Sequence, residues 1–357
     1  MSEAMPPPWL VSAKAIRHCD PTALAELSGA FSEAGLLVVR AACAPAVCAS
    51  CLDAVNQRKA SGSAVYTPIH EPALREEQLL EPLGAVRRAL LAVAASCGAV
   101  LSQRVGPDAE LCELSAITSE PGAAPQRQHA DTTLEPWVLE DGSDASDTSD
   151  ASDTSDASEE AEDRSDGGAE EQASAGRRAA RRRGTRDRRA AEMYFEAVAP
   201  MVTAFVALRD ISVAMGPTRV WPGTHAAAWH CRLLNLDAAA TSEALRLRRS
   251  FDCDVQQGDC VLMDSRLWHC GGANQSDARR TLLVASFLSR DGHPPYGSTY
   301  SLLEHLTGQL TLGGLMREAE AEAEADVGAA AGVGAKRVAC EERDSPVKRV
   351  HLVSNEV

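Results

Sequence analysis

A segment of 50 residues in the middle of the chain cannot contribute to a folded core. Residues 140–171 carry fourteen Asp or Glu and one Arg, largely in a Ser-Asp-Ala-Ser-Asp-Thr repeat that starts at Ser143. Residues 177–189 then carry eight Arg and one Asp. Such segments bury too little apolar surface to offset the entropy lost when a chain becomes ordered. We therefore predict that residues 140–189 are a disordered insertion, and that the sequences on either side of it build the core.

The two charged halves of this insertion allow several roles. The formal net charge of the chain is −16, and most of the excess acid lies in residues 140–171. We expect the halves chiefly to neutralise each other, although the acidic half could bind a basic protein partner or accept phosphate. The arginines of residues 177–189 could also act as a nuclear address or bind nucleic acid. No aromatic residue lies among them, so a base-stacking surface is not expected.

Outside the insertion, apolar patterning predicts helices first and short strands afterwards. Helices are expected at residues 21–34, 44–59 and 81–101, with a strand at 36–40. A final helix is expected at 301–317. Strands are expected at 111–118, around His129, and at 201–211, 220, 251–255, 260–263 and 281–288. This order predicts a mainly β protein, a two-sheet jelly roll with N-terminal helices packed on one sheet.

Three residues far apart in the chain form a pattern typical of a metal site. His129-Ala-Asp131 is followed 138 residues after the aspartate by His269. In an extended strand residues i and i+2 point to the same side, so one strand can present both His129 and Asp131. Two imidazoles and one carboxylate can occupy one face of Fe(II) and leave the opposite positions open for a bidentate acid and O₂. We therefore expect His129, Asp131 and His269 to converge on one metal ion.

Arg280 begins an apolar run that ends at Ser289 and has turn residues on both sides. This run predicts a strand in which Arg280 shares a face with Leu282 and Val284. A guanidinium group binds a carboxylate through two parallel hydrogen bonds. We expect Arg280 to bind the far carboxylate of a keto acid that chelates the metal. Arg279 beside it could fill the same role.

Two turn signals frame a short strand between residues 216 and 225. Gly216-Pro217 and Pro222-Gly223 mark the turns, and residues 218–221 are expected to be the strand. His225 lies just after the second turn. We expect His225 to have a structural role rather than to bind the metal.

Taken together, these motifs resemble the phytanoyl-CoA dioxygenase family, a branch of the Fe(II)/2-oxoglutarate oxygenases. The resemblance covers about residues 20–139 and 190–290, and it includes the helix-to-strand segment Phe31–Arg40. The motifs are Pro121-Gly-Ala-x-x-Gln126-x-x-His129-x-Asp131, Gly216-Pro-Thr-x-x-x-Pro-Gly-Thr-His225 and Gly258-Asp…His269-x-Gly-Gly-x-Asn274-x-Ser…Arg280. The family often has Asn before the Gly-Pro turn, where this chain has Met215. That departure touches none of the expected ligands.

The resemblance implies a cupin-like double-stranded β-helix with Fe(II) held by His129, Asp131 and His269. It also implies that 2-oxoglutarate is held by Arg280, with Gln126 lining the co-substrate pocket. O₂ would be the oxidant, and succinate and CO₂ would be released. Related iron halogenases replace the carboxylate ligand with a small residue, so Asp131 favours hydroxylation.

The resemblance and the insertion together predict four regions. Residues 1–139 would hold the N-terminal helices and the first part of the double-stranded β-helix, and residues 190–317 the remainder with a final helix. Residues 140–189 are the insertion, and residues 318–357 are expected to be a disordered tail. Removing the insertion reduces the spacing between His129 and His269 to about 90 residues, as is typical of the family, and closure entropy grows only slowly with loop length.

Cysteine usage and targeting signals favour a reducing compartment. The eleven cysteines form no secreted framework, and the N-terminus lacks a secretory segment. Cys48-x-x-Cys51 has no second such pair, so a zinc site is not expected. We expect the protein to be cytoplasmic, with a nuclear location open, and to have no membrane span. The C-terminal residues do not match the usual peroxisomal tripeptide.

The leading hypothesis is an Fe(II)/2-oxoglutarate-dependent dioxygenase that hydroxylates a small or lipid-like molecule. One alternative is a hydroxylase of a protein or nucleic acid recruited by residues 140–189. Another is a non-catalytic member of the family that acts as a binding module. The sequence does not identify the substrate, because pocket selectivity depends on elements whose packing it does not reveal.

Overall fold

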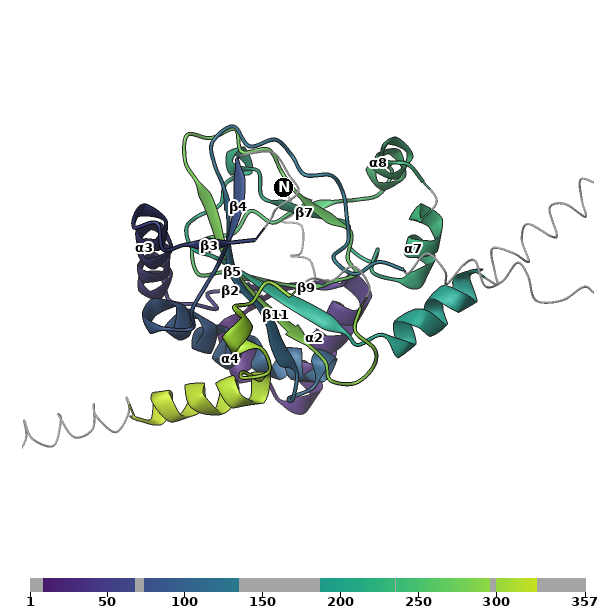
Figure 1. The fold of residues 1–357 in the computed structure, drawn as a ribbon. Helices are drawn as coiled ribbons and strands as arrows, with labels where there is room; N and C mark the ends of the chain where they lie inside the picture. The colour runs from purple at the N-terminus through teal and green to yellow at the C-terminus, as the bar shows by residue number, and fades with distance from the viewer. Residues whose placement is uncertain (1–8, 68–73, 135–186, 235, 296–299, 326–357) are drawn as a thin grey trace, which may run out of the picture.

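Two β-sheets form the centre of the computed structural model, which describes residues 9–67, 74–134, 187–234, 236–295 and 300–325 (Figure 1). The larger sheet has the strand order β1-β2-β9-β6-β11-β5-β4-β3, and the smaller has the order β10-β7-β8. The larger sheet contains β1 (Leu10–Ser12), β2 (Leu36–Arg40), β3 (Val65–Tyr66), β4 (Arg75–Leu79), β5 (Glu110–Ser119), β6 (Met201–Ala207), β9 (Cys260–Asp264) and β11 (Arg280–Leu288). The smaller contains β7 (Thr218–Val220), β8 (Phe251–Asp252) and β10 (His269–Gly271). The predicted jelly roll with flanking helices is confirmed.

The strands of the larger sheet alternate between two cores. On β11, Leu283, Ala285 and Phe287 belong to the core shared with the helices. Leu282 and Val284 point to the opposite face, where they join residues of the smaller sheet in a second core. This period of two follows from the pleat of the strand. The second face, between the two sheets, is the one that Arg280 shares.

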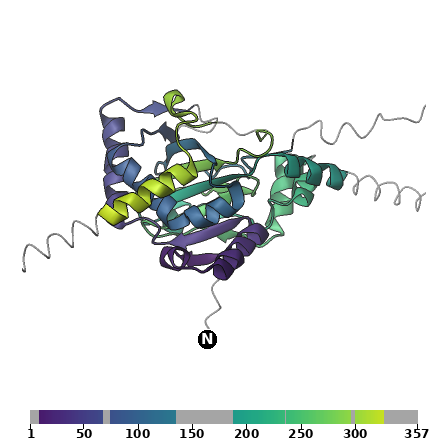
Figure 2. The same ribbon diagram turned by 90° about the horizontal axis from the view of Figure 1, so that it is seen from below.

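Helices cover the outer face of the larger sheet, as Figure 2 shows from below. The described helices are α1 (Ala13–Arg17), α2 (Pro21–Ala34), α3 (Pro45–Ala60), α4 (Gly84–Val105), α7 (Ala227–Leu233) and α8 (Ala238–Arg246), with further helices over 187–197 and 312–325. The 312–325 helix lies beside α4, and the Arg87 Nε atom donates to Glu318 at 2.7 Å. Among the described helices, only α4 is long and apolar enough to cross a membrane, but 61% of its most apolar window is buried inside the protein.

The bounds of α2 follow from its end residues. The Asp20 side chain accepts a hydrogen bond from the Ala23 amide at 2.9 Å and caps the N-terminus. Gly35 ends the helix with a φ of 77°. A Cβ there would lie 2.5 Å from the Nδ1 atom of His225, so this position requires glycine both for its backbone and for its packing.

The structure corrects several expected bounds. The final helix begins at residue 312 rather than 301, because residues 301–311 contain a 3₁₀ turn (Glu304–Leu306) and Gly308 with a φ of 71°. It continues to residue 325, so the tail expected from 318 begins too early: Ala319 is buried in the core. Strand β6 ends at Ala207 rather than Ile211.

The expected insertion lies mostly outside the described residues, because 135–186 are not described. Its last three residues, 187–189, were expected to be disordered but begin the helix over 187–197. This helix is ordered by packing, since Ala191 and Phe195 are buried against Leu134 and Ala227.

Strands β1, β3, β4 and β10 and helices α7 and α8 were not expected. The sequence of β4 is Arg-Glu-Glu-Gln-Leu, which shows no apolar alternation. It becomes a strand because it pairs with β5 from Arg75↔Ser119 to Leu79↔Ser115. Tertiary pairing therefore overrides local propensity here.

Candidate active site

The side chains of His129, Asp131 and His269 lie together between the two sheets. Their potential ligand atoms all lie within 4.8 Å of one another. The Nε2 atom of each histidine is 3.7 Å from the Oδ1 atom of Asp131. The predicted convergence of these three residues, of which His129 and His269 are 140 positions apart, is confirmed.

A short backbone pairing holds the two histidines side by side. The His129 amide donates to the His269 carbonyl at 2.9 Å, and the His269 amide donates back at 2.8 Å. His269 lies on β10, but His129 forms only an isolated bridge. The strand expected around His129 is therefore wrong as a regular element, although its extended backbone still presents Asp131 beside His129.

Both imidazoles are oriented by carbonyl groups. The His129 Nδ1 atom lies 2.9 Å from the Arg127 carbonyl, and the His269 Nδ1 atom lies 2.9 Å from the Leu267 carbonyl. When Nδ1–H donates to these carbonyls, the Nε2 lone pairs are free to bind a metal. Burial lowers the pKa of His269 to about 4, so the ring is neutral at physiological pH, as a ligand must be. This donor set fits Fe(II).

Arg280 is a buried cation that lacks a full set of partners. Its side chain lines the same cavity as His129, Asp131 and His269, and the residue is 2% exposed. The Nη2 atom donates to Ser119 Oγ at 3.1 Å, but within the described residues Nε and Nη1 have no hydrogen-bond partner. Burial and the nearby charge of Arg75 lower the pKa of Arg280 to about 10. A carboxylate in the cavity would satisfy this guanidinium.

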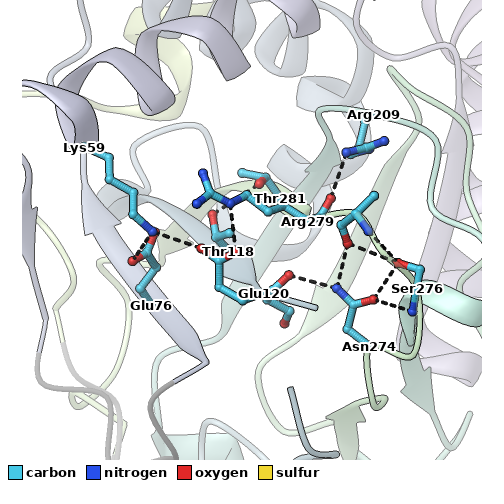
Figure 3. A network of polar contacts seen from close by, with 11 residues as sticks. Lys59, Glu76, Thr118, Glu120, Arg209, Asn274, Ser276, Arg279 and Thr281 are labelled. Carbon is cyan, nitrogen blue, oxygen red and sulfur yellow. Dashed lines mark hydrogen bonds and ion pairs between the residues drawn. The ribbon is translucent and has the colours of Figure 1, made fainter. Parts of the chain in front are cut away.

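Arg279 has a different environment. Its Nε atom donates to Glu120 Oε2 at 2.8 Å. Glu120 also binds Lys59, which pairs with Glu76, so Arg279 belongs to the polar network drawn in Figure 3. This network is partly exposed to solvent. Of the two arginines, only Arg280 lines the cavity of the metal cluster.

The side chains of Gln126, Arg75 and Arg280 meet at Gly271. Gln126 lines the cavity, as expected, and its Oε1 atom accepts from the Gly271 amide at 2.8 Å. A Cβ at residue 271 would lie 2.6 Å from Gln126 Oε1, 2.8 Å from Arg75 Nη1 and 3.1 Å from Arg280 Nη2. Only glycine lets these three side chains meet around β10.

Arg75 was missed by the sequence reasoning. It lies on β4, is 7% exposed, and donates through Nη1 to Ser119 Oγ at 2.5 Å. Its Nη2 atom donates to the carbonyls of Ala124 and Gly272, each at 2.7 Å. Arg75 and Arg280 therefore share the hydroxyl of Ser119. No sequence signal pointed to Arg75, because its strand was not expected.

The cavity that joins these groups has a volume of about 230 Å³. Its apolar wall is formed by Ile117, Phe205 and Leu282. Two further acidic residues, Glu77 and Glu113, also line it and were not expected. The cavity thus combines three candidate metal ligands, a buried cation, an apolar wall and a pair of carboxyl groups.

Other candidate residues lie outside this cavity. The His225 Nε2 atom contacts the Ser32 carbonyl at 2.9 Å, and His225 does not join the metal cluster, as expected. Cys270 is buried against Trp221 and Leu245 as a packed thiol. Within the described part of the chain, the histidine–aspartate cluster is the only group of three or more side chains placed so that they could hold a metal ion.

Comparison with known proteins gives one family match. The model of the family described as phytanoyl-CoA dioxygenase (PhyH) matches residues 181–282. This range contains His269 and Arg280 but not His129 or Asp131. No curated protein matches the chain.

Solved structures with a similar fold include three proteins that are under 20% identical to this chain. The non-heme α-ketoglutarate-dependent epimerase SnoN from nogalamycin biosynthesis is 17% identical, with a TM-score of 0.46 over 76% of this chain and 84% of that chain. The carbocyclase SnoK from the same biosynthesis is 14% identical, with a TM-score of 0.48 over 84% and 92%. HygX from Streptomyces hygroscopicus, with nickel and 2-oxoglutarate bound, is 13% identical, with a TM-score of 0.44 over 73% and 85%.

The family match and the site geometry agree. The match spans a ligand candidate and the buried arginine, while the fold supplies the other two ligand candidates beside them. The resemblance to the phytanoyl-CoA dioxygenase family is thereby confirmed over residues 181–282, and the clustered His129, Asp131 and His269 offer the ligand types that an Fe(II) site needs.

Proposed function

We propose that this protein hydroxylates an unactivated C–H bond of a small or lipid-like organic molecule while 2-oxoglutarate is converted to succinate and CO₂. The observation that carries this proposal is the placement of a buried, incompletely paired guanidinium in one cavity with three clustered ligand side chains. A guanidinium binds one end of a dicarboxylate, while the metal chelates the other end.

In this proposal, His129, Asp131 and His269 hold the iron, which when bound supplies the activation of O₂. The carbonyls of Arg127 and Leu267 fix the histidine rings through Nδ1. These contacts keep both Nε2 atoms directed at one point.

The co-substrate is positioned by Arg280, with Gln126 beside it. The Nε and Nη1 atoms of Arg280 would donate to the far carboxylate of 2-oxoglutarate. The apolar wall of Ile117, Phe205 and Leu282 excludes water from the substrate carbon. Because Asp131 occupies the third ligand position, the cluster favours hydroxylation over halogenation, as the family resemblance implies.

The test is spectroscopic and needs no known substrate. Anaerobic addition of Fe(II) and 2-oxoglutarate should give a weak metal-to-ligand charge-transfer band in the visible range. His129→Ala and Asp131→Ala should lose the band, while Arg279→Ala, in the outer network of Figure 3, should keep it. A folded wild-type protein without the band would contradict the proposal. Succinate release across a metabolite library, with the same variants, then tests turnover and identifies the substrate.

A further inference from the structure

A pair of carboxyl groups lies in the cavity at a distance from Arg280. On the paired strands β5 and β11, Arg280 faces Ser119, whereas Ser286 faces Glu113. These positions are six residues apart, which is about 20 Å along a strand. Glu77 lies on the neighbouring strand β4, opposite Ile117. Glu113 therefore lies in a part of the cavity separate from the arginine that would bind 2-oxoglutarate, while Glu77 lies opposite Ile117, two residues along β5 from Ser119.

The hydrogen-bond donors around these carboxyl groups are neutral. Glu113 accepts from the hydroxyls of Ser286 and Ser115, the latter at 3.4 Å. Glu77 Oε2 accepts from Thr67 Oγ1 at 2.6 Å. Glu77 Oε1 is shielded from solvent, and the described residues provide it with no hydrogen-bond donor.

The charged groups with the largest effects on Glu113 are acidic. Burial, followed by the charge of Glu77, raises the pKa of Glu113 to about 8. Asp131 adds to the same effect. The nearby carboxyl group of Glu77 thus disfavours the ionised form of Glu113. A cation placed between the two carboxyl groups would stabilise the ionised form of Glu113.

We propose that Glu77 and Glu113 bind a positively charged nitrogen of the substrate, a protonated amine, and so select an amine-bearing molecule. An ammonium group donates up to three hydrogen bonds, and its charge-assisted bonds to carboxylates are stronger than neutral ones. It would satisfy Glu77 Oε1 and allow Glu113 to give up its proton. The apolar wall between the glutamates and Arg280 fits a hydrocarbon frame. This proposal rests on the proposed function in one respect, since it takes 2-oxoglutarate to be the ligand that Arg280 binds in the same cavity.

The experiment compares matched probes by calorimetry at pH 7.5. The probes are cyclohexylmethylamine with cyclohexylmethanol, and octylamine with octanol. Each is titrated into the full-length protein, first without metal and then with Fe(II) and 2-oxoglutarate under anaerobic conditions. We expect at least one amine to bind about tenfold or more tightly than its alcohol, because a buried charge-assisted contact contributes more than 1 kcal/mol.

Glu77→Gln and Glu113→Gln should each reduce this preference about tenfold. The matched control is Glu110→Gln on the same strand, because Glu110 pairs with Arg290 near the surface and does not line the cavity. Glu110→Gln should keep the preference for the amine. Thermal unfolding of each variant verifies that it is folded.

Each outcome has a defined meaning. Failure of both amines to bind more tightly than their alcohols, or a preference that survives in both cavity variants, would overturn the amine subsite. A preference that the cavity variants abolish supports it, even in metal-free protein. If that preference is present but wild type lacks the charge-transfer band, the amine subsite stands and the proposed oxygenase chemistry fails.

Discussion

At the scale of single residues, the cavity contains a buried cation and a pair of half-buried carboxyl groups that do not contact each other. Arg280 has two nitrogen atoms without partners in the described structure, and Glu113 faces another carboxyl group. Burying a charge without a partner costs free energy. Such an arrangement lowers stability, and its presence around a metal cluster is typical of a site built for ligands.

Replacing Glu113 should stabilise the protein while it impairs ligand selection. Because the folded pKa is raised from 4.5 to about 8, the wild-type unfolding free energy should fall as pH rises from about 4.5 to 8. Glu113→Gln removes this loss, so at pH 7.5 it should be more stable by roughly 2–4 kcal/mol. Below pH 4.5 this advantage should disappear. Urea unfolding across this pH range measures it.

The half-buried residue Glu110 is the control for this prediction. Glu110→Gln removes a surface ion pair with Arg290, and such pairs contribute at most about 1 kcal/mol. A Glu113→Gln variant that is less stable than wild type at pH 7.5 would contradict this prediction. It would mean that the ionised Glu113 carboxyl group is stabilised by a contact that is absent from this structure.

Arg280 should determine affinity for 2-oxoglutarate. Arg280→Ala removes a buried bidentate donor, so the Kd of 2-oxoglutarate should rise about 100-fold, which corresponds to about 3 kcal/mol. Arg279→Ala should change it by less than about threefold, because that side chain is held by Glu120. Anaerobic titration of the charge-transfer band gives both values. Equal effects of the two variants would contradict the assignment.

At the scale of elements, the three-residue strand β10 brings the site together. It carries His269, pairs with β7 through His269↔Val220, and contacts the extended segment that contains Gln126 and His129. In the larger sheet, strand β4 pairs with β5 on the side opposite to β11, and it carries Arg75 and Glu77. The polar lining of the cavity thus depends on close approach between short segments.

Gly271→Ala tests this close approach. The added methyl would lie within 3.1 Å of side-chain atoms of Gln126, Arg75 and Arg280, so these groups must shift. We expect a loss of stability of about 1–3 kcal/mol and a Kd for 2-oxoglutarate at least tenfold higher. Gly29→Ala on α2 is the matched control, because no atom lies within 4 Å of the position that its methyl would take. Gly29→Ala should stabilise the protein by up to about 1 kcal/mol. If Gly271→Ala leaves the affinity for 2-oxoglutarate unchanged, close packing around Gly271 does not position the co-substrate site.

At the scale of the whole molecule, the segment 135–186 is bracketed by two packed elements. Leu134 is 1% exposed, and it packs in one cluster with Ala191 and Phe195 of the helix over 187–197. The two flanks of the charged sequence are therefore anchored against each other. A short linker can therefore join Leu134 to the helix over 187–197 without altering the two sheets.

Replacing residues 140–186 with a short Gly-Ser linker should leave the fold and the charge-transfer band intact. Closing a shorter loop costs less entropy, so the unfolding free energy should rise by about 1–2 kcal/mol. Turnover of a small substrate should be preserved. If turnover is lost while the band remains, the segment takes part in substrate recruitment, and the alternative of a macromolecular substrate becomes the better one.

Several elements could be predicted because their signals are local. Helix α2 has its expected bounds since Asp20 caps one end and Gly35 ends the other. Strand β11 could be predicted from its continuous apolar run, because it is buried on both faces. Strand β4 could not, since its polar sequence becomes a strand only by pairing with β5.

The sequence by itself determined the type and spacing of the proposed ligands, the arginine pair at residues 279 and 280, and a core built from both sides of the charged segment. Only the tertiary structure decided that Arg280, Glu77 and Glu113 line one cavity and that Arg75 and Arg280 meet beside Gly271. The physical reason is that periodicity specifies which face of a strand is buried. The residues that meet across that face depend on pairing between strands far apart in the chain.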